Sequence, residues 1–192
     1  SLEAGDRLRL FRREHAREFA ARGGVPGAYD TLDDMLAAEP LDALVILSPN
    51  AHHFPYAMAA IERGLHVLCE KPLALSSTQA RQMAEAAERA GVVTMVPFTY
   101  RFMPVNRYLK ELVDEGYIGR PFHLNLRYYT GYGRSGEYSW RFDLDQAGSG
   151  VTGDLGSHWA YLARWFYGEI AAVTAVFSHA VPRAPRPDGV TY

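Results

Sequence analysis

The chain has 192 residues, 48% of them hydrophobic and 22% charged, so it is long enough to bury a sizeable core. The formal net charge is -2 with no run of like charges, which argues against a nucleic-acid-binding or membrane-surface protein. Cys69 is the single cysteine, so an intrachain disulfide and a cysteine metal cluster are excluded, and a reducing, cytoplasmic setting is expected.

Strands and helices alternate through the first half of the sequence. In chain order we expect a strand at 8–11, helices at 14–21 and 31–38, a strand at 43–47, a helix at 54–63, a strand at 66–69, a helix at 76–90 and a strand at 92–96. Thr31 or Asp30 is the expected cap of the second helix, and Ser76 to Gln79 has the spacing of a capping box. This alternation predicts a Rossmann-type, doubly wound parallel α/β sheet over residues 1–98.

The run at 43–47 is apolar throughout, which indicates a strand buried on both faces of the sheet. After Pro97 the pattern changes. Helices are expected at 105–115 and 151–167, and strands with alternating polar positions at 122–130 and 172–180. Alternating strands indicate a sheet with one solvated face, so we predict a second, α+β open-sheet domain over 99–192.

Two segments, 131–136 and 148–153, match the dinucleotide fingerprint G-x-G-x-x-G. The fingerprint requires a strand, a turn and a helix together, because the helix N-terminus must face the pyrophosphate. No helix opens after the first match, and no apolar strand leads into the second. We therefore interpret both as flexible loops.

Two turns follow neighbouring strands of the predicted sheet. Ser48-Pro49-Asn50 lies at the carboxyl end of the first, the edge where open α/β sheets bind ligands; the alternative is a proline turn with a helix cap at Asn50. Glu70-Lys71-Pro72 follows the second, and a lysine there can hydrogen-bond the oxygen of a bound alcohol or carbonyl. The alternative is a surface ion pair between Glu70 and Lys71.

Asp154 and His158 are four residues apart in a predicted helix, so both face one side of it. Histidine can exchange a proton with a hydroxyl near neutral pH while a carboxylate orients it. The alternatives are an i,i+4 ion pair, an acid favoured at a helix start, and a core histidine. A metal pair would need a third ligand that the sequence does not offer, so no metal site is expected.

Several motifs, read in order, carry a family resemblance. They are Ser48-Pro49-Asn50-x-x-His53, Gly64-Leu65-His66-Val67-Leu68-Cys69-Glu70-Lys71-Pro72, Tyr100-Arg101-Phe102-x-Pro104, Trp140-Arg141, Gly148-Ser149-Gly150 and Asp154-Leu155-Gly156-Ser157-His158. Over residues 8–180 the chain resembles the glucose–fructose oxidoreductase/inositol dehydrogenase (Gfo/Idh/MocA) family.

The resemblance implies an oxidoreductase that transfers a hydride between NAD or NADP and a sugar, cyclitol or similar hydroxy or keto compound. It places Lys71 at the reacting oxygen, Asp154 in the substrate pocket, and His158 as the general acid or base. The residues implied to line the cofactor are Ser48, Pro49, Asn50, His53, Glu70, Lys71, Arg101, Trp140 and Arg141. The expected partners are a small-molecule substrate and, through the C-terminal sheet, further copies of the chain, with neither nucleic acid nor membrane.

The chain departs from the family pattern in four places. The family's first strand and glycine-rich loop should precede Leu8, and later strands should follow Tyr192, so we expect a chain truncated at both ends. Tyr161 stands where the family has an acid three residues after the histidine, and Thr99-Tyr100 stands where an asparagine is expected. A non-catalytic, nucleotide-binding relative is the alternative, but the joint presence of the catalytic lysine, aspartate and histidine favours an enzyme.

The residues after the first strand bear on which nicotinamide is used. An acid at the end of this strand would hydrogen-bond the 2′-hydroxyl of NAD. Here Arg12-Arg13 follows the strand, with no acid before Glu14. Arginine can bind a phosphate with two hydrogen bonds, which favours NADP; the alternative is a pair of exposed arginines at a helix start.

Overall fold

The computed structural model of the chain describes residues 9–11, 16–178 and 181–186. The chain divides into two compact units, Ser1–Leu44 and Val45–Tyr192. Within the described residues, none of the helices has both the length and the apolar character that a membrane crossing requires.

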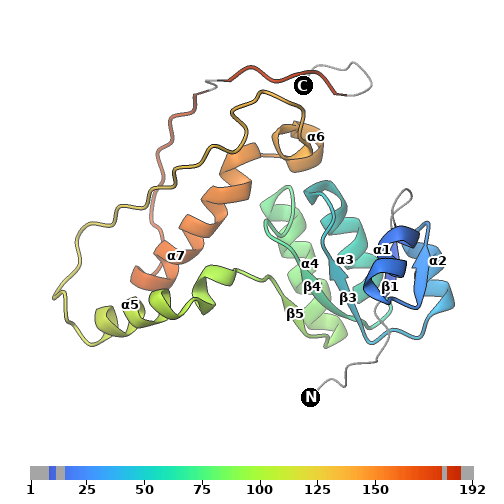
Figure 1. Cartoon of the computed structure of the whole chain (residues 1–192). Coiled ribbons are helices and arrows are strands. Elements are labelled where there is room, and N and C mark those ends of the chain that lie inside the picture. The colour runs from blue at the N-terminus through green and yellow to red at the C-terminus, as the bar shows by residue number, and fades with distance from the viewer. Residues whose placement is uncertain (1–8, 12–15, 179–180, 187–192) are drawn as a thin grey trace. The chain divides into compact units, whose positions relative to one another are not determined.

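The first unit combines two short parallel strands with two helices (Figure 1). Its elements are β1 (Arg9–Phe11), α1 (Ala16–Gly23), β2 (Gly27–Tyr29) and α2 (Leu32–Ala38). As predicted, Thr31 caps α2: its Oγ1 accepts a hydrogen bond from the backbone N–H of Asp34 at 3.1 Å. The sequence did not predict β2, because three residues that begin with glycine carry no periodic pattern.

A three-stranded sheet of order β3-β4-β5 follows. Its strands are β3 (Ala43–Ile46), β4 (His66–Cys69) and β5 (Thr94–Met95). β4 and β5 are parallel, with Val67 opposite Thr94. The backbone N–H of Glu70, directly after β4, donates to the carbonyl of Ile46, the last residue of β3, at 2.9 Å. The carboxyl ends of β3 and β4 therefore meet at one edge, as predicted.

Two helices pack beside this sheet. A 3-10 turn, η1 (Asn50–His52), leads into α3 (His53–Ile61), and α4 (Ser77–Ala90) follows β4. α3 packs against both β4 and α4 (Figure 1). Ser76 caps α4 by accepting from the backbone N–H of Gln79 at 3.2 Å, and Gly91 ends it in the left-handed conformation at φ 66°.

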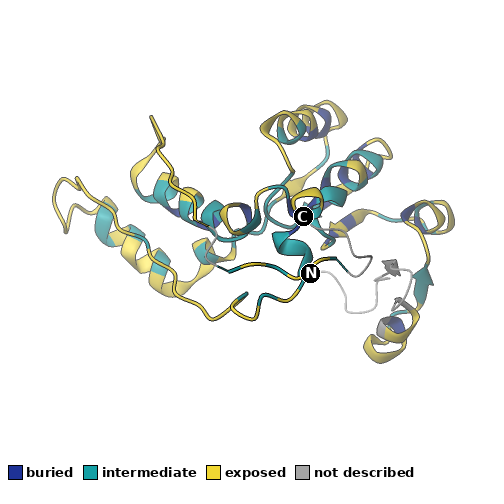
Figure 2. Cartoon of the chain, turned by 90° about the horizontal axis from the view of Figure 1, so that it is seen from above, coloured by how far each residue is buried: buried dark blue, intermediate teal, exposed yellow. Residues whose placement is uncertain are grey.

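The prediction that the 43–47 strand is buried on both faces is wrong. Val45 is 47% exposed and Leu47 is 70% exposed, whereas Ile46 between them is buried. The side chains of a strand alternate between two faces, and the described elements cover only one face of β3. Over the rest of the described chain, buried positions lie mainly on helices and strands (Figure 2).

Helices dominate the rest of the second unit. They are the 3-10 helix η2 (Thr99–Phe102), α5 (Pro104–Asp114), the 3-10 helix η3 (Trp140–Phe142), α6 (Leu144–Ala147), the π-helix η4 (Thr152–Gly156) and α7 (Ser157–Tyr167). The predicted helix at 105–115 is α5. The predicted helix at 151–167 is η4 continued by α7, and α7 also packs on η2.

The strands predicted at 122–130 and 172–180 do not form in the described part of this segment; residues 179–180 lie outside it. Both segments are extended but unpaired, and Phe122 and Val176 are 98% and 95% exposed. Alternating residues become a strand only when a neighbouring strand supplies backbone hydrogen bonds. Neither segment has such a neighbour among the described residues.

Candidate active site

Lys71 and Asp154 form an ion pair between the end of β4 and the π-helix η4. The Lys71 ammonium lies 2.6 Å from the Asp154 carboxylate Oδ1 and 2.6 Å from the Asp154 backbone carbonyl oxygen. Their side chains are 16% and 25% exposed, so the pair is partly shielded from water. The two residues are 83 positions apart in the sequence, and the fold brings these two predicted site residues into contact.

The backbone around Asp154 departs from a regular α-helix. Residues Thr152–Gly156 form a π-helix directly before α7, and such turns are frequent at functional sites. A π-turn shifts the hydrogen-bond register of the carbonyls. The carbonyl of Asp154 accepts a hydrogen bond from Lys71 here. The Nε of Arg141 lies 3.9 Å from the other carboxylate oxygen, Oδ2.

A cavity of about 90 Å³ opens beside this pair. It is lined by Leu47, Ser48, Asn50, Glu70, Lys71, Trp140, Arg141, Ala147, Gly150 and Asp154. Seven of these were predicted site residues from four separate stretches of the sequence. The guanidinium of Arg141 stacks on the Trp140 ring, 4.4 Å from its centre. The predicted turns after β3 and β4 therefore share one cavity with the tryptophan–arginine pair.

Two alternatives drawn from the sequence are wrong for these turns. Glu70 does not pair with Lys71 through its charge: its carboxylate accepts the backbone N–H of Lys71 at 3.0 Å, while the lysine ammonium faces Asp154. Asn50 does not cap a helix with its side chain, since its amide Nδ2 donates to the carbonyl of Ala147 at 3.0 Å. This bond ties the turn after β3 to α6.

His158 lies on α7, one turn beyond Asp154, and is 8% exposed. Its ring packs against two aromatic residues, with centre-to-centre distances of 5.7 Å to Phe98 and 4.6 Å to Tyr100. Burial lowers the pKa of His158 below its ordinary value near 6.5, and the positive charge of Lys71 lowers it further against opposing effects of Asp154 and Glu70. The ring is therefore neutral at neutral pH and able to accept a proton.

Two predicted site residues each have a buried polar atom with no hydrogen-bond partner among the described residues. They are Ser48 Oγ, in the turn that lines the cavity, and Nδ1 of His158, which is not among the residues that line it. Buried polar groups are normally paired, so such atoms indicate where a polar ligand group can bind. The donors and acceptors at this edge fit the reacting end of a nicotinamide nucleotide, and the cavity is too small for a whole dinucleotide.

The structure does not bring every predicted cofactor residue to this cavity. His53 is fully buried, so it cannot touch a ligand directly. Arg101 donates to the hydroxyl of Tyr161 at 2.9 Å, lies over the Trp165 ring and is not among the residues that line the cavity. Pro49 is adjacent to the lining but not part of it. Arg12 and Arg13 lie outside the described residues.

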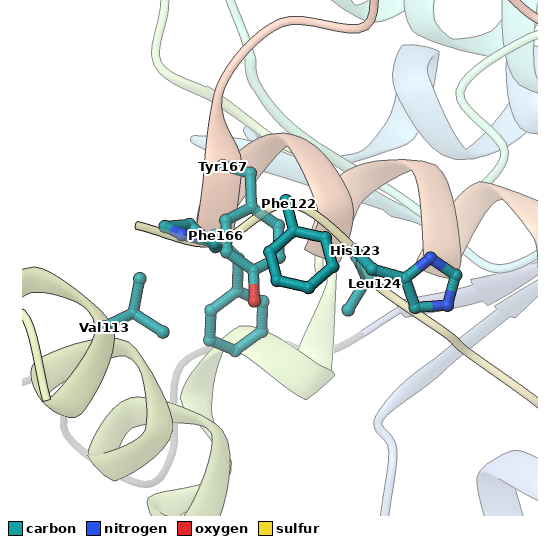
Figure 3. A pocket seen from close by; sticks show the side chains of 7 residues that line it. Val113, Phe122, His123, Leu124, Phe166 and Tyr167 are labelled. Carbon is teal, nitrogen blue, oxygen red and sulfur yellow. The ribbon is translucent and has the colours of Figure 1, made fainter. Parts of the chain in front are cut away.

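A larger hollow of about 500 Å³ lies elsewhere in the second unit (Figure 3). It is lined by Val113, Pro121, Phe122, His123, Leu124, Phe166 and Tyr167. Its walls are mainly aromatic and aliphatic, and they contain no carboxylate or lysine. Titratable groups held in contact are typical of catalytic sites, so the smaller cavity, which contains the Lys71–Asp154 pair, is the better candidate for chemistry.

Sequence reasoning missed the contacts that hold this site together. The backbone carbonyl of Ala147 accepts a hydrogen bond from Asn50, and a backbone acceptor cannot be recognised from the type of side chain. Asp143, which is 1% exposed, caps α6 and pairs with Arg186 from a segment 43 residues later. In the described part of the chain, no three His, Cys, Asp or Glu side chains are grouped to hold a metal ion.

Sequence comparisons agree with this arrangement. Residues 11–98 match the profile described as "Oxidoreductase family, NAD-binding Rossmann fold". Residues 106–191 match the profile of the GFO/IDH/MocA C-terminal domain. Both halves of the chain therefore match profiles of the same family.

Individual relatives point the same way. A levoglucosan dehydrogenase of Pseudarthrobacter phenanthrenivorans is 34% identical over 92% of this chain and 46% of its own length. A D-xylose 1-dehydrogenase (NADP(+)) of Haloferax volcanii is 37% identical over 81% of this chain and 48% of its own. The solved structure of a levoglucosan dehydrogenase in complex with NADH and levoglucosan superimposes with a TM-score of 0.86 at 33% identity, covering 96% of this chain and 52% of that one.

The chain spans about half the length of the curated relatives it matches. Two profiles together cover nearly all of it, and the fold agrees with a solved structure at 33% identity. The chain belongs to the glucose–fructose oxidoreductase/inositol dehydrogenase (Gfo/Idh/MocA) family.

Proposed function

We propose that the protein is an NAD(P)-dependent dehydrogenase that oxidises a CH–OH group of a sugar, cyclitol or similar polyol, or reduces the corresponding ketone. The observation that carries the proposal is the Lys71–Asp154 pair, at 2.6 Å, in a cavity at the carboxyl edge of the sheet. Open α/β sheets bind nucleotides at this edge. Relatives named for levoglucosan, D-xylose and scyllo-inositol support the substrate class.

Lys71 binds and orients the reacting oxygen in this proposal. An ammonium has three N–H donors, and Asp154 accepts two of them. The third remains to donate to a substrate hydroxyl or carbonyl oxygen. The carboxylate of Asp154 keeps the lysine in place and balances its charge, so an oxygen that develops negative charge finds a fixed donor.

His158 holds the proton in this proposal. Its neutral ring accepts the proton of the substrate hydroxyl during oxidation and returns it during reduction. The nicotinamide ring, when bound, supplies the hydride acceptor or donor. Ser48, Asn50, Glu70, Trp140 and Arg141 would hold the nicotinamide end, because they line the same cavity as Lys71.

The test is to follow nicotinamide absorbance when the intact protein is mixed with NAD or NADP and a panel of monosaccharides, anhydrosugars and cyclitols. We expect reduction of the nicotinamide with at least one of them. An intact protein that binds a nicotinamide but oxidises none of the panel would favour the non-catalytic, nucleotide-binding alternative.

The preference between the two nicotinamides is a finer proposal. Arg12-Arg13 at the end of the first strand favours NADP, because a guanidinium can bind the 2′-phosphate. A named relative uses NADP(+), and a solved relative holds NADH, so the family accommodates both. We expect a higher kcat/KM with NADP, and a preference for NAD of roughly tenfold, or about 1.4 kcal/mol, would overturn this assignment.

We make two further proposals, one on the location of the protein in the cell and one on its self-association. We propose a cytoplasmic location, because the lone Cys69 fits a reducing compartment. We propose self-association through the second domain, whose exposed apolar residues include Phe122 and Val176. Sedimentation of the intact protein would test the second point, and a strictly monomeric species would reject it.

A further inference from the structure

His53 connects the two turns that border the cavity. It opens α3 and is fully buried. Its Nε2 lies 2.9 Å from the carbonyl oxygen of Ser48, in the turn after β3. Its Nδ1 lies 2.9 Å from the carbonyl oxygen of Pro72, in the turn after β4. One side chain therefore reaches the backbone of both turns.

In both contacts of His53 the backbone atom is a carbonyl oxygen. A carbonyl oxygen only accepts, so each ring nitrogen forms a hydrogen bond here only when it carries a proton. A ring with one proton donates to one carbonyl, and a ring with two protons donates to both. Each such hydrogen bond resists breaking, since no water reaches a fully buried side chain to replace it.

The carbonyl at the Pro72 end belongs to the residue directly after Lys71. The Lys71 ammonium in turn is held at 2.6 Å from Asp154. A shift of the Pro72 backbone would carry Lys71 with it and lengthen this ion pair. Small displacements matter at such sites, because a change of about 1 Å in a positioned group is enough to lose much of its effect.

We propose that His53 is a positioning residue, which fastens the turn after β3 to the turn after β4 and thereby holds Lys71 against Asp154. This role differs from cofactor contact, which its burial excludes. It goes beyond the proposed function and does not depend on it, since the ion pair is a property of the chain itself.

The two lysines of the chain allow a direct test. This sequence contains two lysines, Lys71 and Lys110, so acetylation followed by mass spectrometry of the peptides that carry them reports on Lys71 with Lys110 as an internal reference. In the unaltered chain we expect Lys71 to react slowly, because it is 16% exposed and paired with Asp154. His53→Asn keeps one short donor that cannot reach both carbonyls.

In His53→Asn we expect the Lys71-to-Lys110 acetylation ratio to rise about fivefold, the factor that the net loss of one hydrogen bond corresponds to. The matched control is His52→Asn, which alters the neighbouring histidine that stacks on Tyr56 at 5.3 Å; here the ratio should not change. A folded His53→Asn variant with an unchanged ratio would overturn the proposal.

A second measurement covers the case in which His53→Asn fails to fold, which its circular dichroism spectrum would reveal. In the unaltered, ¹⁵N-labelled chain, a ring N–H of His53 should exchange slowly with water, because it is buried and donates to a carbonyl. Rapid exchange of every ring N–H of His53 would reject the proposed positioning role. Neither measurement uses nicotinamide or substrate. A negative result for His53 would therefore leave the proposed dehydrogenase activity unaffected, and a lack of dehydrogenase activity would leave the proposed role of His53 unaffected.

Discussion

At the scale of single residues, the site depends on three side chains whose properties are set by their neighbours. Asp154 holds two of the three donors of Lys71, which leaves one for a ligand. His158 is buried against Phe98 and Tyr100 and stays neutral. In contrast, burial and the nearby charge of Glu70 raise the pKa of Cys69 to about 12, so this thiol is unreactive and plays no part in the proposed chemistry.

Removing either proposed catalytic side chain should slow turnover. In the intact protein, Lys71→Ala or His158→Ala should lower kcat by roughly 10²–10⁴-fold, the usual scale for acid–base groups. Steady-state kinetics with the preferred polyol would measure this. Lys110→Ala is the matched control, because Lys110 is partly exposed, pairs with Asp114 on α5 and does not line the cavity. A Lys71 or His158 variant with the turnover of the Lys110 variant would have no place in the mechanism.

The titration of His158 should also appear in stability. The pKa of His158 in the folded chain lies below the ordinary value near 6.5 that it has when unfolded. As the pH falls below 6.5, the unfolded chain therefore binds a proton that the folded chain does not, and the free energy of unfolding decreases. Above 6.5 this contribution is fully present.

The measurement is the melting temperature of the unaltered chain and of His158→Gln between neutral and mildly acidic pH. The unaltered chain should lose stability more steeply than the variant as the pH drops, because glutamine does not titrate. Parallel curves for the two proteins would contradict the assigned environment of His158.

At the scale of elements, α4 shows how local signals place the site. Its start follows the Glu70-Lys71-Pro72 turn, and α4 packs against α3, which carries His53. The cap at Ser76 and the left-handed Gly91 mark both ends. The helices beside the carboxyl edge of the sheet and its two turns therefore begin and end at residues that the sequence identifies.

Loss of the α4 cap should reduce stability by about 1 kcal/mol, the typical cost of replacing a serine N-cap by alanine. The change is Ser76→Ala, which removes the acceptor for the Gln79 backbone N–H at 3.2 Å. Urea denaturation would measure the difference. Ser77→Ala, one residue later at the first helical position, should have a much smaller effect; equal losses for both variants would argue against a capping role.

At the scale of the whole second unit, long-range contacts hold the tryptophan–arginine segment beside the cavity. Asp143 directly follows η3, which carries Trp140 and Arg141. Its buried carboxylate accepts hydrogen bonds from Arg186 and from the hydroxyl of Tyr138, the latter at 3.2 Å. The hydrogen bond from Arg186 is the largest cause that holds the pKa of Asp143 below its ordinary value of 3.8.

Arg186→Gln should shift acid unfolding to higher pH. The stabilisation from Asp143 is present above pH 3.8 and is lost as the pH falls through its lower, folded pKa. Without Arg186 the pKa of the buried carboxyl rises, so protonation and unfolding begin earlier on acidification. Circular dichroism as a function of pH would follow this.

The control for this prediction is Arg164→Gln, which breaks an ion pair with Glu169 whose side chains are 56% and 80% exposed. Exposed pairs contribute little, so its acid transition should stay close to that of the unaltered chain. If the two variants unfold at the same pH, the Asp143–Arg186 pair is not the stabilising contact proposed.

Local rules predicted the parts of this protein that neighbouring residues determine. Apolar runs predicted β3 and β4, and capping residues predicted the starts of α2 and α4. These interactions reach only a few residues along the chain, so a sequence reveals them directly. The same reasoning placed the Ser48 and Lys71 turns at one edge, because the carboxyl ends of parallel strands meet there.

Tertiary structure decided which distant groups meet. No local pattern indicates that Lys71 faces Asp154 rather than Glu70, that Asn50 reaches the Ala147 carbonyl, or that His53 is buried between two turns. The unpaired segments after α5 and α7 show the converse, since a strand pattern becomes a strand only beside a partner. Residue types indicated which side chains could bind or transfer a proton. Which of them meet depends on contacts between residues dozens of positions apart, and these are determined by the path of the backbone and by packing.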